Sequence, residues 1–203
     1  MALSLLVMMG TSVLRAGARP RIPQRVSQAF YSSTPFGSQD AEFMRMALVQ
    51  AAAAAEAGEV PIGAVLTMDD AVLALGRNRV EELGDASAHA EMLCLRAAAG
   101  AAGNWRLNIR PSTLYVTVEP CPMCLAAVFA FRVGRLVYAT KNTRLGAVEG
   151  GMRIPGDHPF HSIQIDSGIL QDEAAEMMQS FFRRRRTETA CILTGGSRKG
   201  AAT

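Results

Sequence analysis

The chain has 203 residues, of which 49% are hydrophobic, and this is enough for one domain of ordinary size with a sizeable core. It contains no apolar run of the roughly eighteen residues that a membrane-spanning helix needs, so we expect no membrane association. The net charge of +3 is not spread evenly over the chain. The four arginines before residue 40 contribute +4, so the rest of the chain has a net charge near −1. Any attraction for nucleic acid must therefore come from a local patch.

Residues 1–39 predict a targeting leader. They are apolar at the start, then rich in Arg, Ser, Pro and Gly, and they contain no Asp or Glu, which is typical of organelle presequences. No basic residue precedes the apolar run over 2–14, which argues against a secretory signal. We expect import into a mitochondrion or a plastid, two destinations that this leader does not distinguish. The alternative is a disordered tail without a targeting role.

The rest of the chain alternates between helical and extended patterns. A helix is predicted over 40–57, a β-hairpin from 61–67 and 71–76, and a helix from about 89 to 99, with Asp85 or Ser87 as its N-cap. Strands over 113–118, 135–139 and 162–165, and helices over 121–131 and 170–186, follow. This order predicts one domain over 40–186, a three-layer α/β/α fold with a mixed five-stranded sheet. Residues 187–203 predict a disordered tail.

Two short motifs carry candidate metal ligands. His89-Ala-Glu91 is followed, thirty-two residues after the histidine, by Pro120-Cys121-Pro-Met-Cys124. The pattern H-x-E…P-C-x-x-C is the signature of the zinc nucleobase deaminases. A catalytic zinc ion takes three imidazole or thiolate ligands and leaves its fourth position to water. His89, Cys121 and Cys124 are therefore the predicted zinc ligands, and Pro120 is expected to begin a helix whose dipole favours thiolate.

Glu91 is the predicted catalytic residue. It lies two residues from His89 near a helix start, so it can face the water without binding the metal. A carboxylate in that place can take a proton from water and later deliver it to a ring nitrogen and to a leaving amine.

Other interpretations of these cysteines and histidines exist. C-x-x-C alone could be a redox pair or half of a structural zinc site, which would need a fourth Cys or His. Cys94 could supply it, but we expect that side chain in the core, and His158 and His161 to be ordinary polar residues. Because both motifs are present and in order, catalytic zinc is favoured. The four cysteines then form no disulfide framework, which favours a reducing compartment.

From Phe43 to Arg186 the sequence resembles the bacterial-type, TadA-like tRNA-specific adenosine deaminases of the cytidine-deaminase-like superfamily. The resemblance rests on the zinc motifs and on flanking stretches such as Glu59-Val-Pro-Ile-Gly-Ala-Val65, Asn104-Trp-Arg-Leu107 and Phe181-Phe-Arg-Arg-Arg-Arg186. It implies a cytidine-deaminase-like fold, one catalytic zinc per subunit, and hydrolytic conversion of the wobble adenosine of a tRNA anticodon to inosine. It also implies a homodimer whose tRNA site draws on both subunits.

The resemblance also assigns substrate contacts. Asn78 matches the asparagine that hydrogen-bonds the target base, and Phe182 and Arg185 fall where the closing helix contacts the anticodon loop. Flipped loop bases need aromatic faces for stacking and arginines for their phosphates. The alternatives are that Asn78 is a turn residue and that Arg183–Arg186 is a solubilising helix end that complements the helix dipole.

One loop departs from the family pattern. The family commonly places Asp near the ribose and Lys two residues later, whereas this chain has Asn142 and Arg144. An asparagine can still accept a hydrogen bond from a 2′-hydroxyl through its carbonyl, but, being neutral, it loses less than a carboxylate when the hydroxyl is missing. We therefore expect a weaker preference for RNA over DNA.

Two other functions are compatible with parts of the sequence. A deaminase of a free base or nucleotide, of the cytosine or guanine type, shares the zinc signature but needs no Phe-Phe-Arg-Arg ending. A non-catalytic RNA-binding subunit could lose Glu91 without losing its fold, so the presence of Glu91 argues against it.

Overall fold

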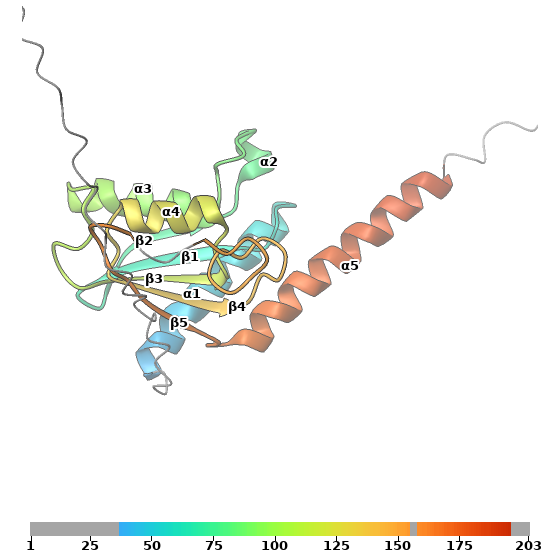
Figure 1. The fold of residues 1–203 in the computed structure, drawn as a ribbon. Coiled ribbons are helices and arrows are strands. Elements are labelled where there is room, and N and C mark those ends of the chain that lie inside the picture. The colour runs from blue at the N-terminus through green and yellow to red at the C-terminus, as the bar shows by residue number, and fades with distance from the viewer. Residues whose placement is uncertain (1–36, 155–157, 196–203) are drawn as a thin grey trace, which may run out of the picture.

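The computed structural model describes residues 37–154 and 158–195, so the predicted leader lies outside the described residues except for its last three positions. The elements follow in the order α1 (Ser38–Glu56), β1 (Gly63–Met68), β2 (Ala71–Arg77), α2 (Val80–Leu83), α3 (Ala90–Ala102), β3 (Ser112–Val118), α4 (Pro122–Ala130), β4 (Arg135–Thr140), β5 (Gln164–Ser167) and α5 (Gln171–Gly195) (Figure 1). Within the described part of the chain, no helix combines the length and apolar character needed to cross a membrane.

One mixed sheet with the strand order β2-β1-β3-β4-β5 lies at the centre. β1 pairs antiparallel with both β2 and β3, whereas β3, β4 and β5 run parallel to one another. A parallel pair needs a crossover connection, and α4 provides it between β3 and β4. The predicted mixed five-stranded sheet is confirmed.

Helices cover both faces of this sheet. Successive residues of a strand point to opposite faces, and accordingly Leu114 and Val116 belong to one buried cluster while Tyr115 belongs to another. The first cluster includes residues of α3 and α4, and the second includes residues of α1 and α5. Figure 1 shows α3 and α4 side by side over one face, α1 across the other, and the second half of α5 extending beyond the sheet. The predicted three layers are therefore confirmed.

The strand register gathers the candidate site residues at one edge of the sheet. Arg77 of β2 pairs with Gly63 of β1, Ala64 pairs with Val116 of β3, and Val118 pairs with Thr140 of β4. The residues that directly follow β2, β3 and β4 therefore emerge at the same edge, although they are far apart in the sequence.

The predicted N-caps of the His89 helix are wrong. Asp85 and Ser87 bond to each other instead, because the Asp85 carboxylate accepts from both the backbone N–H and the hydroxyl of Ser87, each at 2.8 Å. The N-cap of α3 is His89 itself, and α2 is an additional turn of helix that the polar sequence did not predict. At its other end α3 continues through Gly100 and stops before Gly103, whose φ of 61° suits glycine.

The closing helix is longer than predicted, and β5 begins two residues later than predicted. α5 does not end at Arg186 but continues to Gly195, so the predicted disordered tail is wrong for 187–195, and 196–203 lie outside the described residues. The hydroxyls of Thr187 and Thr189 donate to carbonyls one turn earlier, and Arg184 and Glu188 form an i,i+4 pair at 3.8 Å. The i,i+4 ion pair supports helical backbone in this polar sequence.

The start of α3 packs against β2 at a glycine. A Cβ added to Gly76 would lie 2.4 Å from the carbonyl oxygen of Ala90 and 2.9 Å from the Cβ of Cys94. Gly76→Ala should therefore lower the free energy of unfolding by about 1–3 kcal/mol, as overpacking does. Gly100→Ala on α3 is the matched control, because nothing lies within 4 Å of its added Cβ. It should stabilise the helix by about 0.5–1 kcal/mol. Denaturant unfolding of both variants measures the difference, and equal stabilities would contradict this packing.

Candidate metal centre and substrate cavity

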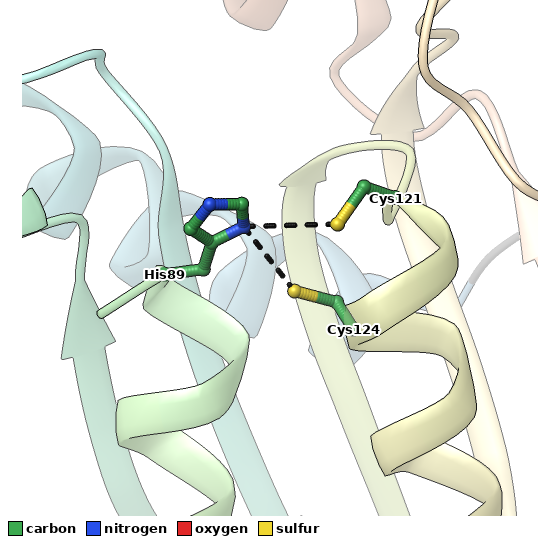
Figure 2. Close-up of side chains that lie close together, drawn as sticks. All are labelled: His89, Cys121 and Cys124. Atoms are coloured by element: carbon green, nitrogen blue, oxygen red, sulfur yellow. Dashed lines mark hydrogen bonds between the residues drawn. The ribbon is translucent and has the colours of Figure 1, made fainter. Parts of the chain in front are cut away.

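The three predicted ligands lie together in space. The ligand atoms of His89, Cys121 and Cys124 all lie within 4.8 Å of one another. Figure 2 shows both sulfurs directed at the same imidazole nitrogen, Nδ1. It lies 3.4 Å from the Sγ of Cys124 and 3.7 Å from the Sγ of Cys121.

Two helix N-termini bring these side chains together. His89 is the N-cap of α3 and Cys121 is the N-cap of α4, while Cys124 lies in the first turn of α4. Neither His89 nor Cys121 makes a side-chain capping hydrogen bond, so both side chains are available to a ligand between the helices. The proline at the first helical position is Pro122, not Pro120 as predicted. The positive end of the α4 dipole favours thiolate at both cysteines.

The electrostatics of the cluster favour a negatively charged sulfur. A hydrogen bond from Cys124 lowers the pKa of Cys121 to about 4, and this hydrogen bond together with burial raises the pKa of Cys124. The hydrogen bond to Cys121 raises the pKa of His89. The lowered pKa of Cys121 favours the thiolate form next to an imidazole and a second sulfur.

This donor set fits zinc. One imidazole nitrogen and two sulfurs that converge on one point match the three-ligand arrangement of catalytic zinc sites. Cys94 is not a fourth ligand: it is fully buried, its thiol donates to the carbonyl of Ala74 at 3.5 Å, and burial raises its pKa to about 12. His158 and His161 contact Arg132 and the carbonyl of Val133 instead. The expectation that Cys94 lies in the core is confirmed.

Glu91 lies beside the cluster, in the first turn of α3, with only 3% of its surface exposed. Burial raises the pKa of this carboxyl group. Its Oε2 is buried and has no hydrogen-bond partner among the described residues. An unpaired buried polar atom is costly unless a ligand satisfies it, so this oxygen is placed to act on a bound molecule.

A cavity of about 1080 Å³ connects the cluster to α5. Its walls include the residues that the sequence analysis singled out: Asn78, His89, Glu91, Cys121, Asn142, Arg144, Phe182 and Arg185. The fold thus gathers these residues around one space, and of the predicted set only Cys124 is not part of its wall.

The sequence analysis missed the residue that holds the loop after β4. Glu119 is 2% exposed and accepts backbone hydrogen bonds from Asn142, Val148, Glu149 and Gly150 at 2.6–2.9 Å. A carboxylate can satisfy several donors at once. No local signal indicated these partners, which lie 23 to 31 residues further along the chain. One buried side chain therefore attaches the cavity loop to the segment that carries the ligands.

The same loop orients Asn142. Its side-chain oxygen accepts from the backbone N–H groups of Arg144 at 3.3 Å and Leu145 at 3.0 Å. The expectation that this carbonyl is available to a 2′-hydroxyl is therefore wrong, because the carbonyl closes a turn of its own loop. The amide nitrogen of Asn142 is the part of the side chain left for a ligand.

The side chains of the run Arg183–Arg186 and of the neighbouring phenylalanines lie in different environments. Arg183 forms an ion pair with Glu176 at 2.8 Å, and Arg184 donates to the carbonyl of Ala55 at 3.5 Å. Phe182 is 42% exposed and lies edge-on to the buried Phe181, while the Arg185 guanidinium lies 5.9 Å from the ring centre of Phe181. An exposed aromatic face and an arginine thus lie together on the cavity wall.

Comparisons with known proteins agree with this geometry. A model of the cytidine and deoxycytidylate deaminase zinc-binding region matches residues 37–140. The tRNA-specific adenosine deaminase of Agrobacterium fabrum is 45% identical over 149 residues, which cover 72% of this chain and 95% of that protein. The chloroplastic tRNA(adenine(34)) deaminase of Arabidopsis thaliana is 45% identical over 163 residues, 72% of this chain but 12% of that much longer protein.

A solved structure is also similar. It comes from work on A-to-I editing by tRNA:A34 deaminases at the wobble position of transfer RNA. It is 46% identical to this chain, has a TM-score of 0.62, and covers 67% of this chain and 98% of its own.

Removing a ligand and removing the proton carrier should have different effects. Cys121→Ala should lose zinc and activity together, because two ligands rarely hold a catalytic zinc. Glu91→Ala should keep zinc while its activity falls ~10²–10⁴-fold, the usual contribution of general acid–base catalysis. Metal analysis by mass spectrometry and a rate assay on both variants measure this difference. Loss of zinc from Glu91→Ala would show that the ligand set is misassigned.

Proposed function

The chain belongs to the tRNA-specific adenosine deaminases, within the cytidine and deoxycytidylate deaminase zinc-binding family, and from this membership we propose that it converts the wobble adenosine of a tRNA anticodon to inosine. The observation that carries the proposal is a cavity with the His89–Cys121–Cys124 cluster and Glu91 at one end and an aromatic, basic helix face at the other. The chain spans 12% of the plant relative's length, so the proposal concerns the deaminase domain alone.

The reaction replaces an amino group by an oxygen. Water adds to C6 of adenine, the C6–N6 bond breaks, and ammonia leaves. His89, Cys121 and Cys124 would hold a zinc ion, which would supply a Lewis acid that lowers the pKa of the attacking water. Glu91 would carry two protons in turn: one from the attacking water to a ring nitrogen, and then the hydroxyl proton of the adduct to the leaving amine. Its raised pKa suits a group that must hold a proton during the reaction.

Asn78 is our candidate for the base contact. It is 4% exposed and lines the same cavity as Glu91. A buried amide that faces a flipped base can recognise that base by hydrogen bonds to its edge. Its position directly after β2 places it at the sheet edge where the metal ligands converge.

Phe182 and Arg185 are our candidates for contacts with the anticodon loop. Each single-stranded base has a face that stacks on an aromatic ring, and arginine binds the phosphates between bases. Both side chains lie on the cavity wall, and α5 continues beyond them to Gly195. Because Arg183 is paired with Glu176 and Arg184 with Glu188, Arg185 is better placed to meet RNA.

The proposal also includes the oligomeric state of the protein and its location in the cell. A homodimer, which the family resemblance implies, stays a prediction. Import into an organelle, a mitochondrion or a plastid, is supported by the acid-free, arginine-containing leader over 1–39 and by a relative that is named chloroplastic.

The function is tested on matched RNA substrates. The zinc-loaded protein should form inosine in a tRNA anticodon stem-loop with adenosine at the wobble position, and none when guanosine replaces that adenosine. Free cytosine and guanine should not be turned over, because they reach neither Phe182 nor Arg185. Mass spectrometry of nucleosides measures the products. Faster turnover of free cytosine or guanine than of the stem-loop would identify the protein as a free-base deaminase instead.

Asn142 should weaken the preference for RNA over DNA. Its amide nitrogen can donate to a 2′-hydroxyl, and a neutral donor left unpaired beside deoxyribose costs less than an unpaired carboxylate. In Asn142→Asp one oxygen can still close the loop turn while the other accepts from the hydroxyl. The ratio of kcat/KM on RNA to that on single-stranded DNA should therefore rise by a factor that corresponds to about 1–3 kcal/mol. Equal ratios for both proteins would mean that residue 142 does not contact the sugar.

A further inference from the structure

Glu59 is a buried carboxylate with a defined partner in the cavity wall. It is 1% exposed, and its Oε2 accepts from the side-chain Nδ2 of Asn78 at 3.0 Å. Its other oxygen, Oε1, accepts from the backbone N–H of Glu82 at 2.8 Å. Glu59 and Asn78 both line the cavity that contains Glu91. The zinc chemistry uses neither of them.

This contact removes a degree of freedom from Asn78. A side-chain amide can usually turn over and exchange its oxygen for its nitrogen, because the two ends have the same shape. Both oxygens of Glu59 accept hydrogen bonds in this arrangement, so the end of the amide that faces Glu59 is the NH₂ group. Glu59 itself cannot turn away without breaking its bond to the Glu82 backbone.

We propose that Glu59 is a positioning residue that fixes the orientation of the Asn78 amide, and through it the hydrogen-bond pattern that the cavity offers to the purine base. The proposal rests on the base contact of Asn78 given under the proposed function. The amide keeps one N–H and its carbonyl oxygen for other partners, and Glu59 determines on which side each lies. The positions of donors and acceptors along a base edge distinguish one purine from another.

Glu59→Gln tests the orientation with almost no change of volume. Its side-chain oxygen can still accept from the backbone N–H of Glu82, and its new NH₂ group then faces Asn78. Two NH₂ groups repel, so the Asn78 amide should turn over and present its oxygen to residue 59. The packing survives, but the donor and acceptor of Asn78 exchange places in the cavity.

A double-mutant cycle separates this role from a structural one. We expect Glu59→Gln to lower kcat/KM on the anticodon stem-loop about 10-fold to 100-fold, mostly through KM, as a misplaced buried hydrogen bond does. We expect no additional loss from Glu59→Gln in an Asn78→Ala background, because the amide on which it acts is gone. Zinc content and thermal stability should match the wild type. Glu56→Gln, which removes the same charge from an exposed position on α1, is the control and should change nothing.

Each result of the cycle decides the proposal. An equal loss with and without Asn78 would show that Glu59 acts through the Glu82 backbone, and would overturn the proposal. An Asn78→Ala variant with normal kcat/KM would overturn it as well, while deamination of tRNA stands. If the wild type forms no inosine, the proposed function is wrong. The orientation of the Asn78 amide can then still be tested by NMR. Contacts between the Asn78 amide protons and the Glu59 side chain, lost in Glu59→Gln, support the orientation, and their absence in the wild type contradicts it.

Discussion

The convergence of two helix N-termini on one point is the constraint on which the site depends. His89 is the N-cap of α3 and Cys121 is the N-cap of α4, and neither residue makes a side-chain capping hydrogen bond. The antiparallel β1 and the parallel pair of β3 and β4 set the two helices side by side. Gly76 lets α3 approach β2 closely at its first turn. The ligand geometry is therefore a consequence of sheet register and helix packing, not of a flexible loop.

Three buried glutamates around the cavity have different degrees of hydrogen bonding. Glu119 accepts four backbone N–H groups and holds a loop, and Glu59 accepts one backbone and one side-chain donor. Glu91 has an oxygen with no partner among the described residues. Since buried polar atoms are normally satisfied, the unsatisfied oxygen is the one available to a reacting molecule. In our proposals, one kind of side chain thus serves three purposes: Glu119 holds a loop, Glu59 orients an amide, and Glu91 transfers protons.

Much of this could be predicted from the sequence, because short-range patterns carried it. Strand alternation and the zinc motifs identified the sheet and the ligands, and the structure brings His89, Cys121 and Cys124 together as expected. The features that depend on long-range or competing contacts could not be predicted from the sequence. Asp85 looked like an N-cap but bonds to Ser87, and nothing local to Glu119 or Glu59 indicates that its partners lie some 20 to 30 residues away. The polar composition after Arg186 concealed the continuation of α5.

The central claim is that one histidine and two cysteines hold a zinc ion with one position left open. X-ray absorption at the zinc edge of the zinc-loaded protein tests this, because it separates sulfur neighbours from nitrogen or oxygen neighbours and counts imidazoles by their outer-shell scattering. We expect two sulfur neighbours at about 2.3 Å and two light neighbours at about 2.0–2.1 Å, one imidazole nitrogen and one water oxygen. Three or four sulfur neighbours, or a second imidazole in place of the oxygen, would contradict it, because the site would then be closed and structural.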